Sequence, residues 1–333
     1  MLFLHVGTHK TGTTALQTFL ARQSEKLEPN GIHYLQSGRA TSRGHHELAW
    51  AVREVKDADP TAWAKVRAEL RSDPAQTQVM SSEAFWFCDP ADVKAQLGGE
   101  MDIRVVMYLR RQDKFLQSLY KQTIAGGRKI SFDEWRRRFG FRGDYLSVVQ
   151  KWADQFGKDS LLIRPYEREG QTIDVVADFM RVLGTKVETV TKKKKRGNHN
   201  PTPRRELMEL LRAFNQLNVD VDRNKFFYSI MTRSKSYIRT ADILNHDECA
   251  ALIQEFAPGN QILIRDYYRD SAPLFPELTQ FAPPLIWEPG SKEYFDMVVD
   301  VLDAVWNAAV SQPRNGAPYG KTKSSSEPPS TSA

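Results

Sequence analysis

The N-terminal segment constrains the fold most, because it combines a buried strand, a glycine-containing turn and a helix. The apolar run Leu2–Val6 leads directly into the turn Gly7–Thr14. Apolar residues then recur at helical spacing, at Leu16, Phe19 and Leu20. In this arrangement the backbone N–H groups of the turn and the N-terminus of the helix point at an anion. The segment therefore predicts a phosphate-binding loop in an α/β fold.

The position of the lysine in this turn decides which kind of phosphate loop it is. In nucleoside triphosphatases the loop reads G-x-x-x-x-G-K-[ST], with the lysine directly after the second glycine. Here Lys10 stands two residues before Gly12, and Thr13 occupies the position of that lysine. The triphosphatase motif is therefore excluded by spacing. Lys10 still supplies a positive charge, and Thr13 and Thr14 supply hydroxyl groups at the first helical turn.

A second segment with phosphate-binding character starts at Val105. Val105–Leu109 is a continuous apolar run, which is typical of a strand buried on both faces of a parallel sheet. Arg110 follows at its C-terminal end, where open α/β sheets bind ligands. Ser118 lies eight residues further on, two turns into an apparent helix. Because a planar guanidinium can bind phosphate bidentately, Arg110 is the expected anion contact.

Taken together, the order Lys-x-Gly-Thr-Thr after a short strand and the spacing of Arg110 and Ser118 resemble the sulfotransferases. These enzymes use 3′-phosphoadenosine 5′-phosphosulfate (PAPS) as donor, and bacterial sulfotransferase-like proteins are the members that the chain resembles. The resemblance implies a P-loop-like, mainly parallel sheet flanked by helices, with a helical C-terminal portion. It implies that the loop binds the 5′-phosphosulfate, that Arg110 and Ser118 hold the 3′-phosphate, and that no metal is needed. The donor-binding residues it implies are Lys10, Thr11, Gly12, Thr13, Thr14, Arg110 and Ser118. One departure is Gln112, because the family usually has proline two residues after the arginine.

The rest of the chain alternates between strand-like and helix-like patterns as far as Tyr166, as expected for a parallel sheet covered on both faces. Strands are predicted at Leu2–Val6, Ile32–Leu35, Gln78–Ser81, Ile103–Leu109 and Ser160–Arg164. Helices are predicted between them at Thr13–Leu27, His46–Val55, Thr61–Leu70, Asp113–Ala125 and Tyr145–Phe156. Beyond Tyr166 only helices are predicted, at Ile173–Leu183, Arg204–Leu217, Asp247–Glu255 and Lys292–Val310. We therefore expect a donor-binding core over residues 1–185, a basic loop and helical extension over 186–311 that completes the same domain, and a disordered tail over 312–333.

Composition agrees with this interpretation. The 333 residues carry a formal net charge of +6, which suits a donor with several phosphates and would suit an anionic acceptor. No zinc-ligand spacing or RNA-recognition motif accompanies the charge, so nucleic acid is not the expected partner. Cys88 and Cys249 are expected as reduced, buried thiols, with a disulfide between them as the alternative. No apolar stretch reaches the ~20 residues of a membrane span and no signal peptide precedes the first strand, so a cytoplasmic enzyme is expected.

Sulfuryl transfer requires a cation at the leaving phosphate and a base for the acceptor. Lys10 is the expected cation, since negative charge builds on the bridging oxygen. Two places offer a base: the pair His45 and His46 at the start of an apparent helix, and Glu83 at the end of a predicted strand. Members of the resembled family use either residue type. We favour the histidines, because a neutral imidazole is more basic than an unperturbed carboxylate.

The expected function is transfer of the sulfuryl group from PAPS to a hydroxyl or amine, with release of 3′-phosphoadenosine 5′-phosphate. A carbohydrate or lipid headgroup is the favoured acceptor, and a small metabolite is a further possibility. Two alternatives are a nucleotide-dependent phosphotransferase and a non-catalytic, basic glycan- or nucleic-acid-binding protein. The basic run Lys192–Arg196 predicts either a solvated loop or a lid over an anion, and Leu211–Asn215 resembles the end of the helix that follows such a segment in some bacterial relatives.

Overall fold

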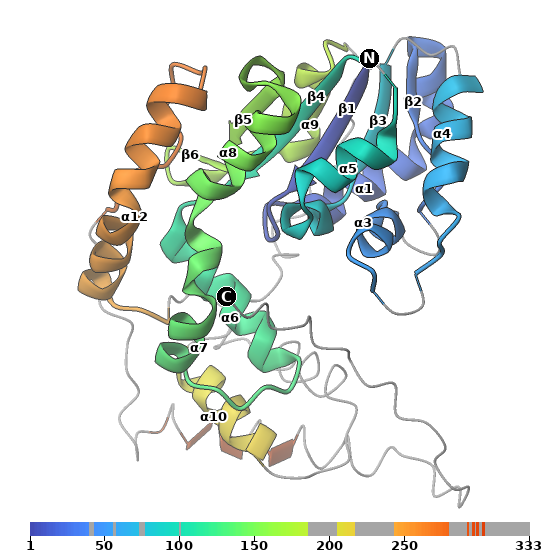
Figure 1. Ribbon diagram of the computed structural model, residues 1–333. Helices are drawn as coiled ribbons and strands as arrows, with labels where there is room; N and C mark the ends of the chain where they lie inside the picture. The colour runs from blue at the N-terminus through green and yellow to red at the C-terminus, as the bar shows by residue number, and fades with distance from the viewer. Residues whose placement is uncertain are drawn as a thin grey trace, which may run out of the picture.

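A five-stranded parallel sheet organises the chain (Figure 1). The computed structural model describes residues 1–39, 43–55, 58–72, 77–99, 101–185, 205–216 and 243–279, with a few positions between 292 and 303. The strand order is β2-β3-β1-β4-β5, and every neighbouring pair is parallel. The strands are β1 Leu2–Gly7, β2 Ile32–Tyr34, β3 Thr77–Ser81, β4 Ile103–Leu109 and β5 Leu161–Pro165. The mainly parallel α/β sheet predicted from the sequence is confirmed.

Helices cover both faces of this sheet (Figure 1). The α-helices are α1 Thr13–Arg22, α2 Ser24–Leu27, α3 His46–Val52, α4 Ala62–Ser72, α5 Pro90–Leu97, α6 Gln112–Ala125, α7 Phe132–Phe139, α8 Tyr145–Phe156, α9 Val175–Val182, α10 Arg205–Gln216 and α12 His246–Tyr267. Short 3₁₀ turns are η1 Glu28–Asn30, η2 Glu83–Phe87, η3 Gly140–Gly143 and η4 Lys158–Ser160. No helix in the part of the chain described here is both long and apolar enough to span a bilayer.

Side-chain alternation along β1 divides the interior into two apolar layers. Leu2, Leu4 and Val6 are buried in the layer that also holds residues of α3, α4, α5, α6 and α8. Phe3 points the other way and packs in a layer with α1 and α9, including Phe179. Since successive side chains of a strand face opposite sides, a strand covered on both faces must be apolar at every position. This explains why the sequence of β1 is a continuous apolar run apart from His5.

Several elements differ from the predicted ones. The predicted helix Thr13–Leu27 is two helices, because the backbone leaves helical geometry at Gln23, which ends α1 and begins α2. The helix predicted to end at Glu255 continues to Tyr267 through Pro258. Buried leucines in both halves of α12 account for this, since tertiary packing outweighs the hydrogen bond that proline removes.

Two helices and two short strands were also not predicted. The helices α5 and α7 were missed, although α5 begins with an Asp89 cap and a proline at its first position. Beyond Tyr166, where no strand was expected, Glu167–Arg168 and Gln171–Thr172 pair as a two-stranded antiparallel ribbon, β6 and β7. Strands of two residues carry too little alternation to be recognised in a sequence.

The C-terminal helices pack on the α/β core. The side-chain amide of Asn215, in α10, donates hydrogen bonds to the carbonyls of Ile124 (2.8 Å) and Arg128 (3.0 Å) at the end of α6. The Gln112 amide donates to Asn260 of α12 (2.6 Å). The basic run Lys192–Arg196, the tail 312–333 and most of the predicted helix Lys292–Val310 lie outside the described residues.

The two cysteines are free thiols rather than a disulfide. Cys88 is buried at the end of η2, where its thiol donates to the carbonyl of Ala49. Cys249 is buried in α12 and accepts a hydrogen bond from Gln117. Both therefore act as small apolar residues of the interior, as the reduced state expected from their separation implies.

Candidate active site

The loop between β1 and α1 lies at the carboxyl edge of the sheet and is held by its own backbone. The Thr8 N–H donates to the carbonyl of Tyr108 at the end of β4 (2.9 Å), and the Thr11 hydroxyl donates to the Thr8 carbonyl (2.6 Å). Lys10 and Gly12 have φ values of 63° and 77°, in the left-handed region. A Cβ at Gly12 would lie 3.2 Å from Val175, so glycine is also required by the close approach of α9.

This loop leaves the N-terminus of α1 open. Gly12 is the N-cap and provides no side-chain hydrogen bond to the first amides of the helix. Thr11 and Thr13 are buried, whereas Thr14 is exposed at the first turn. Uncapped amides and the helix dipole together favour an anion at this position. The sequence prediction of an anion-binding loop is therefore compatible with the geometry, with Thr14 as its exposed hydroxyl.

Lys10 shares this edge with Arg110. Burial lowers the pKa of the Lys10 ammonium, Glu83 opposes that shift, and the charge of Arg110 adds to it. A cation whose pKa is lowered by a neighbouring cation is expected where an anion binds. Lys10 follows β1 and Arg110 follows β4, and these two strands are parallel neighbours, so both residues lie at the carboxyl edge of the sheet although they are far apart in the sequence.

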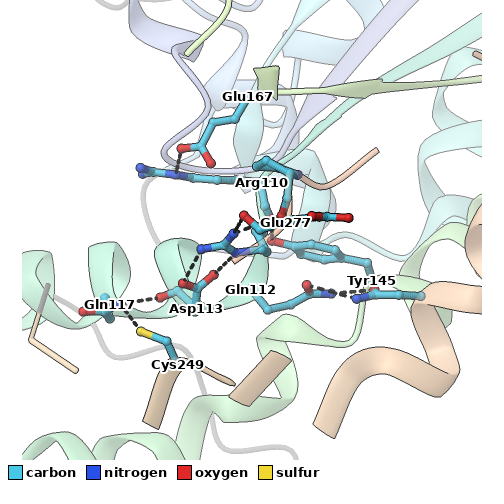
Figure 2. Close-up of polar contacts among 11 residues, drawn as sticks. Arg110, Gln112, Asp113, Gln117, Tyr145, Glu167, Cys249 and Glu277 are labelled. Atoms are coloured by element: carbon cyan, nitrogen blue, oxygen red, sulfur yellow. Dashed lines mark hydrogen bonds and ion pairs between the residues drawn. The ribbon is translucent and has the colours of Figure 1, made fainter. Parts of the chain in front are cut away.

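The consecutive residues Arg110 and Arg111 have different surroundings. Figure 2 shows Arg110 beside Glu167. Arg110 donates from Nε to Glu167 Oε1 (3.0 Å), and its guanidinium lies 5.4 Å from the centre of the Tyr166 ring. Its Nη groups have no protein partner among the described residues. Arg111 is buried and holds Asp113 bidentately, at 2.7 and 2.9 Å. Arg110 is therefore the residue available for a ligand, and Arg111 is structural.

Ser118 lies in the same helix, α6, as the buried Asp113. It is half-buried, two turns after the start of the helix at Gln112. Gln112 replaces the usual proline, and its amide joins α12 instead. This departure from the resembled family thus serves helix packing rather than ligand contact.

The two adjacent histidines, His45 and His46, also have different surroundings. His45 is completely buried: Nε2 lies 2.9 Å from the Leu35 carbonyl, and Nδ1 accepts from the Ser81 N–H (3.1 Å). Burial lowers the pKa of His45 to about 3, so its ring is neutral. Because both ring nitrogens bind the backbone, His45 joins the end of β2 to the end of β3 and has no ring nitrogen free for a ligand. Of the two histidines predicted as base candidates, only His46 stays available.

His46 and Glu83 form a pair at the end of β3. The His46 Nε2 lies 4.0 Å from Glu83 Oε2, and its Nδ1 lies 2.8 Å from the Ser82 hydroxyl. Glu83 Oε2 also accepts from the Gln17 amide (2.8 Å). Burial acts to raise the pKa of Glu83, but His46, Gln17 and other neighbours outweigh it, so the pKa is lowered. The pair therefore combines an ionised carboxylate with an imidazole.

Sequence reasoning missed two polar residues of this edge. His9 precedes Lys10 in the loop, and its ring packs against Phe87 with centroids 5.1 Å apart. Burial lowers the pKa of His9 to about 4, although Glu83 opposes the shift. Gln17 was missed because its buried amide lies one turn beyond Thr13, on the face of α1 that was expected to be apolar. A polar residue on an apolar helix face was the only signal available.

No cluster of three or more histidine, cysteine, aspartate or glutamate side chains with metal-binding geometry occurs within the described ranges. The polar side chains named at this edge are instead Lys10, Arg110, Glu83 and His46. The arrangement can bind an anion at the helix N-terminus and accept a proton on the neighbouring strand.

Comparisons with known proteins give few relatives. No family model matches the chain. A protein of Archaeoglobus fulgidus described as uncharacterized is 27% identical over 201 residues, which cover 57% of this chain and 53% of that protein. The chain thus spans about half the length of this relative. A solved sulfotransferase from Alicyclobacillus acidocaldarius aligns with 80% of this chain and 96% of its own, with a TM-score of 0.40 and 15% identity. A likeness this weak carries no weight for the activity.

Proposed function

We propose that the protein is a PAPS-dependent sulfotransferase that transfers the sulfuryl group to a hydroxyl or amine of an acceptor and releases 3′-phosphoadenosine 5′-phosphate. The observation that supports the proposal is the uncapped N-terminus of α1 after a loop that contains Lys10, beside the end of the neighbouring strand β4, where Arg110 lies and lowers the pKa of Lys10. The His46–Glu83 pair at the end of the adjacent strand supplies the base that accepts the proton of the acceptor.

The donor fits the residues present. The backbone of the loop and the amides of Gly12, Thr13 and Thr14 would hold the 5′-phosphosulfate, with Thr11 fixing the loop from inside. Arg110 would hold the 3′-phosphate through its Nη groups, with Ser118 as hydroxyl donor. Glu167 on Nε keeps the guanidinium oriented, so less conformational freedom is lost on binding.

In the reaction, a bond forms between the acceptor oxygen or nitrogen and sulfur, and the bond between sulfur and the bridging phosphate oxygen breaks. The bond's electron pair passes to that oxygen, where Lys10 stabilises the developing charge. The acceptor loses its proton to a base at the same edge. Transition-state charge at the bridging oxygen is greater than ground-state charge, so Lys10 should act on turnover more than on binding.

We assign the base to His46. With the Nδ1 proton donated to Ser82, Nε2 is free to take the acceptor proton. The resulting imidazolium then faces the Glu83 carboxylate, 4.0 Å away. This use of a carboxylate to stabilise a protonated histidine is common to many acid–base pairs. Gln17 fixes the carboxylate, so Glu83 is a positioning residue in this proposal.

Labelled donor tests the proposal directly. The protein is incubated with ³⁵S-labelled PAPS and fractionated extract, and labelled products are identified by mass spectrometry. We expect a sulfated acceptor whose formation requires Lys10 and survives EDTA. Lys10→Ala is the test variant, and Lys26→Ala, on α2, is the matched control. Transfer of label from γ-³²P ATP but not from PAPS would instead identify a phosphotransferase.

A further inference from the structure

Two guanidinium groups lie against one aromatic ring beside the proposed active site. Phe87, at the end of η2, has the Arg142 guanidinium 5.1 Å and the Arg53 guanidinium 5.9 Å from its ring centre. The ring of His9 packs on the same phenylalanine at 5.1 Å. These residues come from four separate segments, so the fold alone brings them together. We call Phe87, Arg53 and Arg142 the arginine–phenylalanine cluster.

Within the described residues, no acidic group balances the charges of this cluster. The side chains of Arg53 and Arg142 make no ion pair or hydrogen bond with any other residue in those ranges, and the Arg53 backbone N–H donates to the Ala49 carbonyl. The Nε of Arg142 and the Nδ1 of His9 are buried without a hydrogen-bond partner there. Burial lowers the pKa of Arg142, and the neighbouring charge of Arg53 lowers it further. Both arginines are half-buried, and a half-buried cation without a counter-ion loses hydration that nothing replaces, so this arrangement is expected where a ligand supplies the anion.

The cluster continues directly from the proposed base. His46, Trp50 and Arg53 are spaced by four and three residues, so they share one face of α3 and its C-terminal cap. That face runs along η2, with His46 beside Glu83 at one end and Arg53 beside Phe87 at the other. An acceptor whose hydroxyl reaches His46 therefore extends over the two guanidinium groups.

We propose that Arg53 and Arg142 bind an anionic substituent of the acceptor, a carboxylate or a phosphate or sulfate ester. The acceptor class is then an acidic molecule rather than a neutral one. This rests on the proposed function for the position of the reacting hydroxyl. The donor's own phosphates are assigned to the α1 N-terminus and to Arg110, on the β4 side of the loop, and so leave the cluster to the acceptor.

The test separates acceptor charge from donor binding. Protein saturated with 3′-phosphoadenosine 5′-phosphate is titrated with methyl β-D-glucuronide, glucose 6-phosphate and methyl β-D-glucoside, followed by NMR. We expect each anionic probe to bind at least about 10-fold more tightly than the glucoside, because each charged hydrogen bond contributes substantially. Arg53→Gln and Arg142→Gln should remove that preference, and Arg142→Lys should restore part of it. Arg71→Gln, an exposed arginine on α4, should leave it unchanged.

Two results would overturn the inference while leaving the proposed function intact. One is equal binding of the three probes by wild-type protein. The other is loss of bisphosphate affinity in Arg142→Gln with the glucuronide preference retained, which would assign the cluster to the donor. Failure of the proposed function looks different: wild-type protein would not bind the bisphosphate. The titration repeated without bisphosphate would then still show whether the preference for anions depends on Arg53 and Arg142.

Discussion

The candidate active site has a proposed donor side and a proposed acceptor side, and the positively charged side chains of the two sides have different neighbours. On the donor side, Lys10 and Arg110 each have an acidic neighbour, Glu83 and Glu167 respectively. On the acceptor side, Arg53 and Arg142 share a phenylalanine ring and have no acidic partner within the described residues. In the proposed function, acidic neighbours hold the donor-side cations in place before any ligand binds, whereas Arg53 and Arg142 would gain their counter-charge from the acceptor.

This difference has a consequence for recognition. Cations that already have carboxylate neighbours exchange one anion for another, so their net gain on binding is moderate. Cations without such neighbours gain the full interaction, and they reject ligands that lack the anion. Donor binding should therefore depend on geometry, and acceptor choice should depend on charge.

The largest expected effect separates turnover from binding on the donor side. Lys10→Ala should lower kcat by about 100- to 1,000-fold, the range found when one stabilising group at a developing anion is removed. Its affinity for 3′-phosphoadenosine 5′-phosphate should change much less, as measured by calorimetry. A variant that raises KM and keeps kcat would show that Lys10 only docks the donor.

The next effect distinguishes the residues of the acceptor side. His46→Gln should lower kcat by about 100-fold or more, as expected for loss of a general base. Glu83→Gln should retain more activity than His46→Gln, because the proton acceptor stays in place and only the carboxylate that faces the imidazolium is lost. A dead Glu83→Gln with an active His46→Gln would make the carboxylate the base.

Low pH should decrease the free energy of unfolding, because His5 and His45 are buried as neutral rings. Burial lowers the pKa of His5 to about 4 and that of His45 to about 3. The unfolded chain therefore binds protons first: the stability contributed by these neutral rings is complete above about pH 6.5 and falls as pH drops toward the folded values. The free energy of unfolding, measured by urea titration, should decrease between about pH 7 and about pH 5 by on the order of 1–2 kcal/mol per histidine. His45→Asn should have a flatter dependence, and an unchanged slope would contradict the neutral, buried state of His45.

The strand–loop–helix units that carry the proposed donor-binding residues could be predicted from the sequence, because their signals are local. The turn Gly7–Thr14 and the pair Arg110 and Ser118 each lie within one strand–turn–helix unit, whose position at the sheet edge follows from parallel topology. The strands were predicted within a residue or so for the same reason, since buried parallel strands are apolar at every position.

The acceptor side could not be predicted in this way. Nothing in the sequence distinguishes His45 from His46. Whether each ring is buried against the backbone depends on how the loop before α3 crosses β2 and β3. Phe87 and Arg142 belong to short 3₁₀ turns whose meeting is set by the packing of remote helices. Contacts of this kind arise from tertiary structure and have no sequence period.

The smallest effect concerns the hydroxyl partner of Arg110. Ser118→Ala should weaken binding of 3′-phosphoadenosine 5′-phosphate by about 1 kcal/mol, or about 5-fold, the typical contribution of one hydrogen bond. Binding of AMP should be unaffected, because AMP has no 3′-phosphate. Equal losses for both nucleotides, measured by calorimetry, would show that Ser118 acts through the structure of α6 instead.

We propose that Lys10 and Arg110, at the carboxyl edge of the sheet, recognise a 3′,5′-bisphosphorylated nucleotide. Calorimetric titration with 3′-phosphoadenosine 5′-phosphate and with AMP tests it most directly. We expect the bisphosphate to bind more tightly than AMP by about 1.5–3 kcal/mol, which is roughly 10- to 100-fold. We expect Arg110→Ala to abolish this difference. Equal affinity of the wild-type protein for the two nucleotides would contradict it.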